Sequence, residues 1–508
     1  MRRRGRGKAL LFLLLALLGA ALPALARPGG GQGYSGGGGG GSGGGGGDGG
    51  LVWLLIRLWF ELLIRYPAVG VPLTILVIVY FVRRAKSGGA AKHWDSAPSA
   101  RPTPPASRPA PDLEAVRSLD PDFSAVLFED FVYALYARAH QARADRTALD
   151  ALAPYLSAAV REELARRPPA GAPVSAVVVG ALHVVAVAMP ADTPAGAPAL
   201  VSAFVKITLG IEANVTVGAA GAESTQYVEE RWDLARGAGV RSKPPEAVTT
   251  FHCPNCGAPF EPSEPSGGDR CQYCGQVVSG GRFDWSVEAV ELVRLEGRPP
   301  ALTGTVEEVG TDWPTVFHPA LRERRAALLR DDPTATDEAL TARLRLIYSE
   351  LNTAWTNLDL APVRPYVSDG LFDYLQYWIA AYRSQGLRNV LQEMRLTEVT
   401  AVKVVRDRWY DAITFRIWGT GRDSTVRQAT GAVVGGDPRH DRAYSEYWTL
   451  IRGAGVRGAP RADKTCPSCG APLDTNMAGE CAHCGAKVTS GQFDWVLSKI
   501  EQDDSYTG

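Results

Sequence analysis

Two stretches of the chain carry apolar side chains at the spacing of an α-helix. In the first stretch, Phe123, Leu127, Phe131 and Leu135 recur every four residues. At 3.6 residues per turn, this spacing places the four side chains on one broad helical face. Residues 340–355 carry a similar face. The pattern predicts a long amphipathic helix in each half of the chain.

Each helical stretch is followed by three segments rich in β-branched and aromatic residues, the composition typical of strands. The segments of the first half are 174–188, 200–217 and 226–235, and those of the second half are 396–405, 410–418 and 443–451. Helices followed by consecutive strands with short connections indicate an α+β fold with an antiparallel sheet.

The N-terminal segments show other patterns. A basic cluster from Arg2 to Lys8, an apolar run and a small-residue site predict a signal peptide over residues 1–26, cleaved after Ala26. Residues 27–50 are almost entirely glycine, so they cannot bury enough apolar surface to fold and are predicted to form a flexible tether. Residues 51–65 are apolar, with Arg57, Glu61 and Arg65 on one face, which is typical of an interfacial amphipathic helix.

Residues 66–82 are uncharged and rich in valine, isoleucine and leucine, and they predict a transmembrane helix. Basic residues between Arg83 and Lys86 follow directly. The positive-inside rule therefore places the N-terminus outside and all later residues in the cytoplasm. Residues 83–117, rich in proline, alanine and serine, are predicted to be a linker.

Beyond the linker, five short motifs occur twice in the same order. Asp120-Pro121 returns as Asp332-Pro333, and residues 152–157 (LAPYLS) return as 363–368 (VRPYVS). Glu230-Arg231-Trp232 returns as Glu446-Tyr447-Trp448, and Phe283-Asp284-Trp285 returns as Phe493-Asp494-Trp495. The sequence RGAGVR occurs unchanged at 236–241 and 452–457. One unit is therefore predicted to be duplicated. We name the part of the chain that carries the first set of motifs the first repeat, and the part that carries the second set the second repeat.

These motifs resemble the C-terminal domain of Tim44, a subunit of the mitochondrial inner-membrane translocase, as it occurs in bacterial Tim44-like proteins. The resemblance rests on residues 120–124 (DPDFS), the Pro-Tyr-Leu-Ser element and the Glu-x-Trp strand, and it covers about 115–245 and 330–460. It implies a fold similar to nuclear transport factor two, with helices on a strongly curved antiparallel sheet around a deep apolar cavity. We therefore predict two cone-like domains at 118–245 and 330–460, a connecting segment at 287–329 and a tail at 497–508.

The resemblance also implies membrane attachment and partner binding, because the mitochondrial family member tethers the import motor to the membrane channel. This chain departs from that pattern in having its own predicted span, two such domains and two additional cysteine modules. We recognise no chaperone-binding segment of the mitochondrial kind.

All eight cysteines fall into two copies of one doubled CxxC pattern. They are Cys253, Cys256, Cys271 and Cys274 in the first copy, and Cys466, Cys469, Cys481 and Cys484 in the second. Two residues between paired cysteines let a tight turn direct both sulfurs at one tetrahedral Zn²⁺. The pattern predicts zinc ribbons at 250–286 and 464–496, in preference to disulfides, a rubredoxin-type iron centre or a thioredoxin-like redox pair. A closed four-cysteine site is structural, so we expect two structural zinc ions and no catalytic metal.

Charge argues against nucleic acid as a partner. The chain has 54 basic and 54 acidic residues, so no overall attraction to phosphate follows. Acidic residues outnumber basic ones in both predicted ribbons, and four thiolates on one Zn²⁺ add further negative charge. His252 and His483 adjoin cysteines, but we do not expect them to bind the metal because four thiolates already suffice.

No catalytic constellation is evident, and we predict that the protein is not an enzyme. Asp130, Glu230 and Glu446 are the carboxylates that could serve as a base in a cavity. Glu230 and Glu446 fit a structural hydrogen bond beside tryptophan equally well, and His183 fits a hydrogen-bonded strand position. The alternative is a cavity enzyme of isomerase or hydratase type acting on an apolar substrate. A buried polar pair would favour that alternative, whereas an apolar lining would favour binding.

The sequence thus predicts a single-pass protein of the bacterial inner membrane with cytoplasmic C-terminal domains. Its expected role is that of a scaffold that tethers a protein partner, or holds a lipid or hydrophobic peptide in its cavities. Two structural zinc ribbons would support the two domains.

Overall fold

The computed structural model describes residues 111, 113–190, 204–260, 269–297, 302, 308, 310–461 and 463–508. The predicted signal peptide, tether, interfacial helix and transmembrane helix lie outside these residues, as does most of the predicted linker. At the end of that linker, Leu113–Ser118 forms a 3-10 helix, η1. Within the described ranges, no helix combines the length and the apolar character that a membrane span requires.

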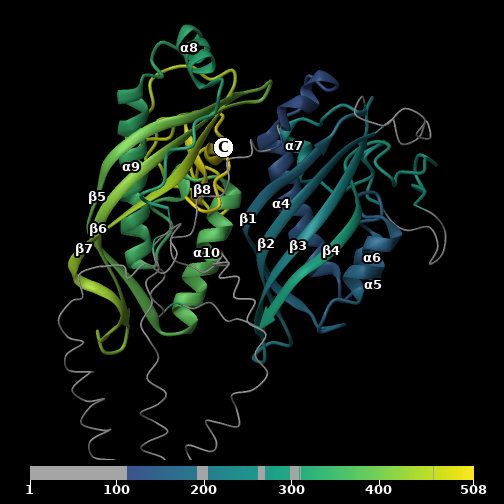
Figure 1. The fold of residues 1–508 in the computed structure, drawn as a ribbon, viewed down its shortest axis with the longest axis horizontal. Coiled ribbons are helices and arrows are strands. Elements are labelled where there is room, and N and C mark those ends of the chain that lie inside the picture. The colour runs from purple at the N-terminus through teal and green to yellow at the C-terminus, as the bar shows by residue number, and fades with distance from the viewer. Residues whose placement is uncertain are drawn as a thin grey trace, which may run out of the picture. The chain divides into compact units, whose positions relative to one another are not determined.

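The first repeat contains three helices followed by an antiparallel sheet (Figure 1). The helices are α4 (Ala125–Ala142), α5 (Arg146–Asp150) and α6 (Ala158–Ala165). The strands are β1 (Val174–Ala188), β2 (Phe204–Val217), β3 (Ser224–Gly237) and β4 (Ser286–Gly297), paired in that order, and the short helix α7 (Pro245–Val248) follows β3.

The second repeat keeps the order of a long helix, a second helix and four strands, and one further helix precedes its Asp332-Pro333 motif. Its helices are α8 (Leu321–Asp331), α9 (Asp337–Asn357) and α10 (Asp369–Ser384), with the 3-10 helix η4 (Arg364–Tyr366) before α10. Its strands are β5 (Leu387–Arg406), β6 (Tyr410–Arg427), β7 (Val433–Gly453) and β8 (Val496–Gln502), and their order in the antiparallel sheet is β5-β6-β7-β8. The predicted mixture of helices with two antiparallel sheets is confirmed.

The fourth strand of each sheet was missed by the sequence analysis. It assigned the residues of β4 to a connecting segment and those of β8 to a tail. Both strands instead follow a cysteine module and pair with the preceding strand, β4 with β3 and β8 with β7. Each module is therefore an insertion between the third and fourth strands of its own sheet.

Residues beyond β8 are also held against the second sheet. Arg416 is buried on β6, and its guanidinium donates hydrogen bonds to the carbonyl oxygens of Gly310 and Trp313. Its Nη2 also lies 3.0 Å from a carboxylate oxygen of Asp503. One arginine thus fixes both the segment before α8 and the residues after β8.

The serine of the Pro-Tyr-Leu-Ser motif begins a helix in each repeat. The hydroxyl oxygens of Ser157 and Ser368 accept hydrogen bonds from the backbone N–H groups of Val160 and Leu371, so they cap α6 and α10. The backbone N–H of each serine donates to a fourth-strand carbonyl oxygen, that of Val287 or Leu497. The motif therefore recurs because it joins a helix start to the fourth strand.

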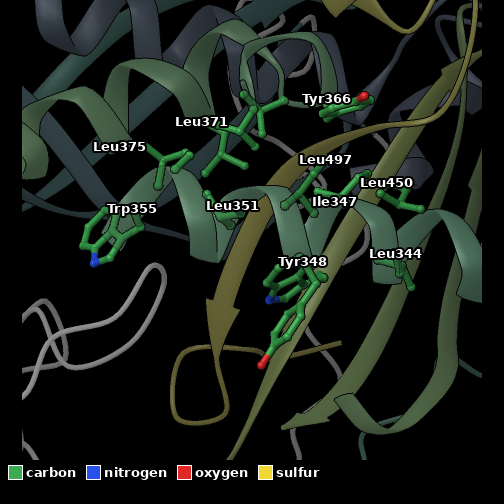
Figure 2. Packing of buried hydrophobic residues seen from close by; sticks show 14 of the residues in the cluster. Leu344, Ile347, Tyr348, Leu351, Trp355, Tyr366, Leu371, Leu375, Leu450 and Leu497 are labelled. Carbon is green, nitrogen blue, oxygen red and sulfur yellow. The ribbon is translucent and has the colours of Figure 1, made fainter. Parts of the chain in front are cut away.

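The space between helices and sheet is filled by large side chains. In the second repeat, Trp355 and Trp378 are completely buried with Leu344, Ile347 and Leu351. Figure 2 shows several residues of this cluster, including Tyr348, around α9 and the neighbouring strands. In the first repeat, a corresponding cluster surrounds Trp232 on β3. This packing differs from the open apolar cavity that the resemblance implies.

A buried ion pair explains two further repeated motifs. Asp120 of the first Asp-Pro accepts a hydrogen bond of 2.9 Å from Arg236 of RGAGVR, and both side chains are buried. Arg452 and Asp332 form the same pair at 2.8 Å in the second repeat. Each arginine also lies over the tryptophan of a Phe-Asp-Trp motif, at 4.6 Å from the Trp285 ring and 4.4 Å from the Trp495 ring. We name these two sets the Asp-Arg-Trp clusters.

Replacing Arg452 by leucine should strongly destabilise the second repeat. The substitution leaves Asp332 as an unpaired buried charge, which costs about 3–5 kcal/mol. Urea unfolding followed by tryptophan fluorescence measures the loss. Arg457→Leu is the matched control, because this arginine ends the same RGAGVR motif but is 40% exposed, and its loss should cost at most about 1 kcal/mol. Equal effects of both substitutions would contradict the assignment.

Candidate functional site

The eight cysteines lie in two separate clusters of four. Within each cluster, all sulfur atoms are within 4.8 Å of one another. The Sγ atoms of Cys253 and Cys274 are 3.8 Å apart, and so are those of Cys466 and Cys484. A tetrahedron with metal–sulfur bonds of about 2.3 Å has edges of about 3.8 Å, whereas a disulfide requires about 2.05 Å. The clusters therefore have the geometry of four-thiolate metal sites, and either could hold a metal ion.

Each CxxC pair is shaped by a tight turn that ends in glycine. The backbone N–H groups of Gly257 and Gly275 donate to the carbonyl oxygens of Cys253 and Cys271. Both glycines have positive φ angles, +76° and +70°, which disfavour any residue with a Cβ. Gly470 and Gly485 repeat this arrangement in the second cluster.

The two histidines beside the cysteines do not complete either cluster. His252 and His483 both have exposed side chains, and the four-residue groups contain cysteines alone. The carbonyl oxygen of His252 instead accepts a hydrogen bond of 2.8 Å from the Tyr155 hydroxyl. This contact joins the first ribbon to the Pro-Tyr-Leu-Ser motif.

The Phe-Asp-Trp motif links each ribbon to its parent domain. Phe283 packs against the cluster that contains Cys253 and Cys271, and Trp285 lies in the core of the first repeat. In the second repeat, Phe493 contacts the ribbon cluster and Trp495 lies in the domain core. The motif therefore binds the parent domain with one ring and the metal module with the other.

A buried arginine in each repeat forms a hydrogen bond with the cysteine module. In the first repeat, Arg161 of α6 donates a 3.1 Å hydrogen bond to Asp269 of the ribbon. In the second, Arg364 donates a 3.0 Å bond to the carbonyl oxygen of Met477 and pairs with Asp369 at the start of α10. These contacts show that each ribbon is docked on its own repeat.

The Glu-x-Trp motif makes one local hydrogen bond in both repeats. The indole N–H of Trp232 donates to Glu230 at 2.9 Å, and that of Trp448 donates to Glu446 at 2.8 Å. Both glutamates are almost completely buried. Two roles were considered for these glutamates, a catalytic base and a structural hydrogen bond beside tryptophan. Both glutamates form the structural hydrogen bond.

Glu230 also belongs to a buried polar cluster that the sequence analysis missed. A 3.1 Å hydrogen bond joins His140 Nε2 to Glu230, and Arg167 donates to the other carboxylate oxygen at 3.1 Å. Burial alone would raise the pKa of Glu230, but the His140 and Arg167 charges and the hydrogen bonds lower it to about 2. His140 lies one turn beyond Tyr136 on the apolar face of α4. This spacing was the only feature of the sequence that indicated a buried position for His140.

The remaining candidate residues do not join this cluster. Asp130 lies at an exposed position of α4. His183 is half-buried on β1, with Nε2 3.9 Å from Glu212, and desolvation lowers the pKa of its imidazole. It therefore fits the structural strand position expected for it.

Each repeat contains one of the two hollows considered as possible ligand sites. The smaller, about 30 Å³, lies beside Arg236 and Trp285 and is lined by Phe123, Phe128 and Lys243 among others. The larger is a groove of about 730 Å³ between α9 and β5. Polar side chains such as Asn352 and Thr356 line much of it, so it differs from the deep apolar cavity that the resemblance implies.

Comparison with known protein families identifies one region. Residues 323–460 match the family model described as Tim44-like domain. The match covers α8 to β7 of the second repeat, so the chain contains a Tim44-like domain. A search of curated proteins finds no match for the chain.

Substituting one cysteine in each cluster should remove one metal ion per site. Metal analysis of the purified chain should give two ions per molecule, with one in Cys256→Ser, one in Cys469→Ser and none in the double variant. A chelator should increase tryptophan exposure to quenchers, because Trp285 and Trp495 join the ribbons to the domain cores. Ser468→Ala is the control and should keep both ions. Retention of two ions in the single variants would contradict the assignment.

Glu230 should make the stability of the first repeat depend on acid. Its folded pKa of about 2 lies below the ordinary 4.5, so its contribution is complete above about pH 4.5 and is lost as the pH falls toward 2. The shift corresponds to about 3 kcal/mol. Glu230→Gln should lower stability at neutral pH and flatten this acid dependence in urea unfolding, whereas the neighbouring Glu229→Gln should do neither. An unchanged pH profile in Glu230→Gln would refute the role assigned to this carboxylate.

Proposed function

We propose that this protein is a membrane-anchored scaffold that holds a protein partner at the cytoplasmic face of a bacterial inner membrane. The observation that carries the proposal is the Tim44-like domain at residues 323–460, because this family implies binding and tethering. The predicted span at 66–82, followed by basic residues, supports anchorage with the N-terminus outside.

The first repeat is proposed to be a second copy of the same domain. It has the same sheet order and the same Asp-Arg-Trp cluster, and its helices α4 and α6 correspond to α9 and α10. Two similar domains on one anchor give the chain two binding faces at one membrane site. This arrangement suits a scaffold.

The metal in both clusters is proposed to be structural Zn²⁺. Four thiolates at tetrahedral spacing are the ligand set that zinc prefers, and a closed set leaves no open position to activate water. Each ribbon joins the third and fourth strands of its sheet. Zinc would therefore hold the fourth strand, and the tryptophan before it, in register.

The buried pair of His140 and Glu230 is the observation of polar chemistry that the enzyme alternative would need. However, both oxygens of Glu230 already accept hydrogen bonds from protein groups. A carboxylate with a pKa of about 2 is also a weak base at neutral pH. Neither residue lines the two hollows described above. We therefore favour a binding protein over an enzyme.

Deleting residues 62–82 should release the protein from the membrane. The full chain expressed in a bacterium should stay in the membrane pellet after an alkaline wash, and protease added to spheroplasts should leave the C-terminal repeats intact until the membrane is opened. Deletion of the glycine-rich residues 29–50 is the control and should leave the chain in the pellet. Proximity labelling from Gly508 would then identify membrane partners that depend on the anchor. A wild-type chain found in the soluble fraction would refute the proposal.

A further inference from the structure

One buried arginine of the first repeat differs from the rest in having no carboxylate partner. Arg143 follows the last residue of α4 and is 5% exposed. Its Nη2 donates a hydrogen bond of 3.5 Å to the carbonyl oxygen of Pro168, and no carboxylate of the described residues forms an ion pair with it. The other buried arginines of the described ranges each form an ion pair with an aspartate or a glutamate, as Arg236, Arg364 and Arg452 do.

Arg143 belongs to the buried polar cluster around Glu230. Desolvation lowers the pKa of its guanidinium, and the charges of Glu230 and Arg167 also act on it. With His140 protonated, three cationic side chains therefore lie near one buried carboxylate. A second carboxylate, Glu163, pairs with Arg167 from a position that is 39% exposed. The cluster then carries one more positive charge than negative charge.

Each of the three cations also has a covered nitrogen without an acceptor. These atoms are Arg143 Nε, Arg167 Nη2 and His140 Nδ1, and none has a hydrogen-bond partner among the described residues. His140 Nε2 faces the Glu230 carboxylate, so both ring nitrogens are donors when the imidazole is protonated. An ordered water could accept these hydrogen bonds, but it carries no charge. An anion supplies both the acceptor and the charge.

The second repeat has an apolar side chain at the position of Arg143. Tyr136 lies against the tryptophan of the first Glu-x-Trp motif, and Tyr348 lies against that of the second. Arg143 follows Tyr136 by seven residues, and Trp355 follows Tyr348 by the same number. Trp355 is completely buried. The fold therefore does not require a charge at this position.

The position of Arg167 has changed in the same way. Ser157 and Ser368 begin α6 and α10 as helix caps. Arg167 follows Ser157 by ten residues, and Trp378 follows Ser368 by ten. Trp378 is also completely buried. Two arginines of the first repeat are thus replaced by two core tryptophans in the second.

The glutamate itself is kept in the second repeat. Glu446 accepts hydrogen bonds from Trp448 and from the Gln502 amide. Asn352 takes the helical position of His140, and strand β5 bulges on the other side of the neighbouring groove at Glu393. The three cationic positions of the first repeat are therefore all uncharged in the second.

We propose that the first repeat binds a small monovalent anion beside Arg143, with Arg143 Nε and Arg167 Nη2 as its hydrogen-bond donors. One negative charge balances the cluster, whereas a divalent anion would add a second charge close to Glu230. Arg143 and Arg167 each keep 5% exposure, so the site lies just beneath the surface and within reach of solvent ions. The anion would complete the core of the first repeat as Trp355 and Trp378 complete that of the second.

Hydrogen exchange of α4 tests the site, with chloride as the probe. The purified full chain in detergent is transferred from sodium gluconate to sodium chloride at constant ionic strength, because gluconate is a monovalent anion too large for a covered site. At a chloride concentration about ten times its Kd, exchange of residues 136–143 should slow about tenfold, since the opened form does not bind the ion. Residues 348–355 of α9 are the internal control, and their exchange should not respond.

Two variants locate the response. Arg143→Leu should show the same α4 exchange in chloride and in gluconate. Arg166→Leu is the matched control, because Arg166 is 69% exposed, and it should keep the response of the wild type. If Arg143→Leu fails to fold, the comparison of α4 with α9 in the wild type still decides the question. Acetate in place of chloride distinguishes the sources of the charge: slowing by both assigns the site to halides and small carboxylates, and slowing by chloride alone assigns it to halides.

Three results would overturn the inference. Exchange of α4 that responds to neither chloride nor acetate would leave ordered water as the acceptor. Equal slowing of α4 and α9, or an unchanged response in Arg143→Leu, would show a general salt effect or an adventitious ion only. A stronger response to sulfate than to chloride would contradict the assignment of a monovalent anion.

Discussion

The Asp-Arg-Trp cluster is the interaction on which each repeat depends. It joins the Asp-Pro motif before α4 or α9, the end of the third strand and the residue before the fourth strand. An arginine buried at this junction requires a charged partner, because an unpaired guanidinium in the core would be strongly destabilising. The aspartate neutralises it and the tryptophan covers it. The arginine can therefore be buried only when the Asp-Pro motif, the end of the third strand and the Phe-Asp-Trp motif pack together.

This junction explains why each cysteine module is inserted between the third and fourth strands. A ribbon too small to have a core of its own is stabilised by its metal. Inserted between the third and fourth strands, it also fixes the position from which the fourth strand begins. The backbone confirms the connection, since Gly237 and Gly453 donate to carbonyl oxygens of Gly281 and Gly491 just before the Phe-Asp-Trp motifs. Under the proposed assignment of the clusters as metal sites, binding of the metal would be coupled to closure of the sheet.

Much of this architecture could be predicted from local patterns. Helical periodicity located α4 and α9, and cysteine spacing located both four-cysteine clusters, because each feature is set by residues close together in the sequence. Strands β4 and β8 were missed because they follow the ribbons, and β4 alternates charged residues such as Glu291 with few buried ones. His140 and the bulge at Glu393 depend on contacts with distant strands. No local pattern records such contacts.

Duplication allows the two sheets to be compared position by position. In the first repeat, His140 Nε2 is hydrogen-bonded to Glu230, and its buried Nδ1 has no hydrogen-bond partner among the described residues. The second repeat keeps the same scaffold but leaves Asn352 unpaired beside a strained bulge. Substitutions that remove such costs are readily found, because natural proteins are seldom at their stability optimum. Both repeats therefore keep a buried polar atom without a partner at this helical position, and they differ in the strand beside it, where β5 bulges against the glycines of β6.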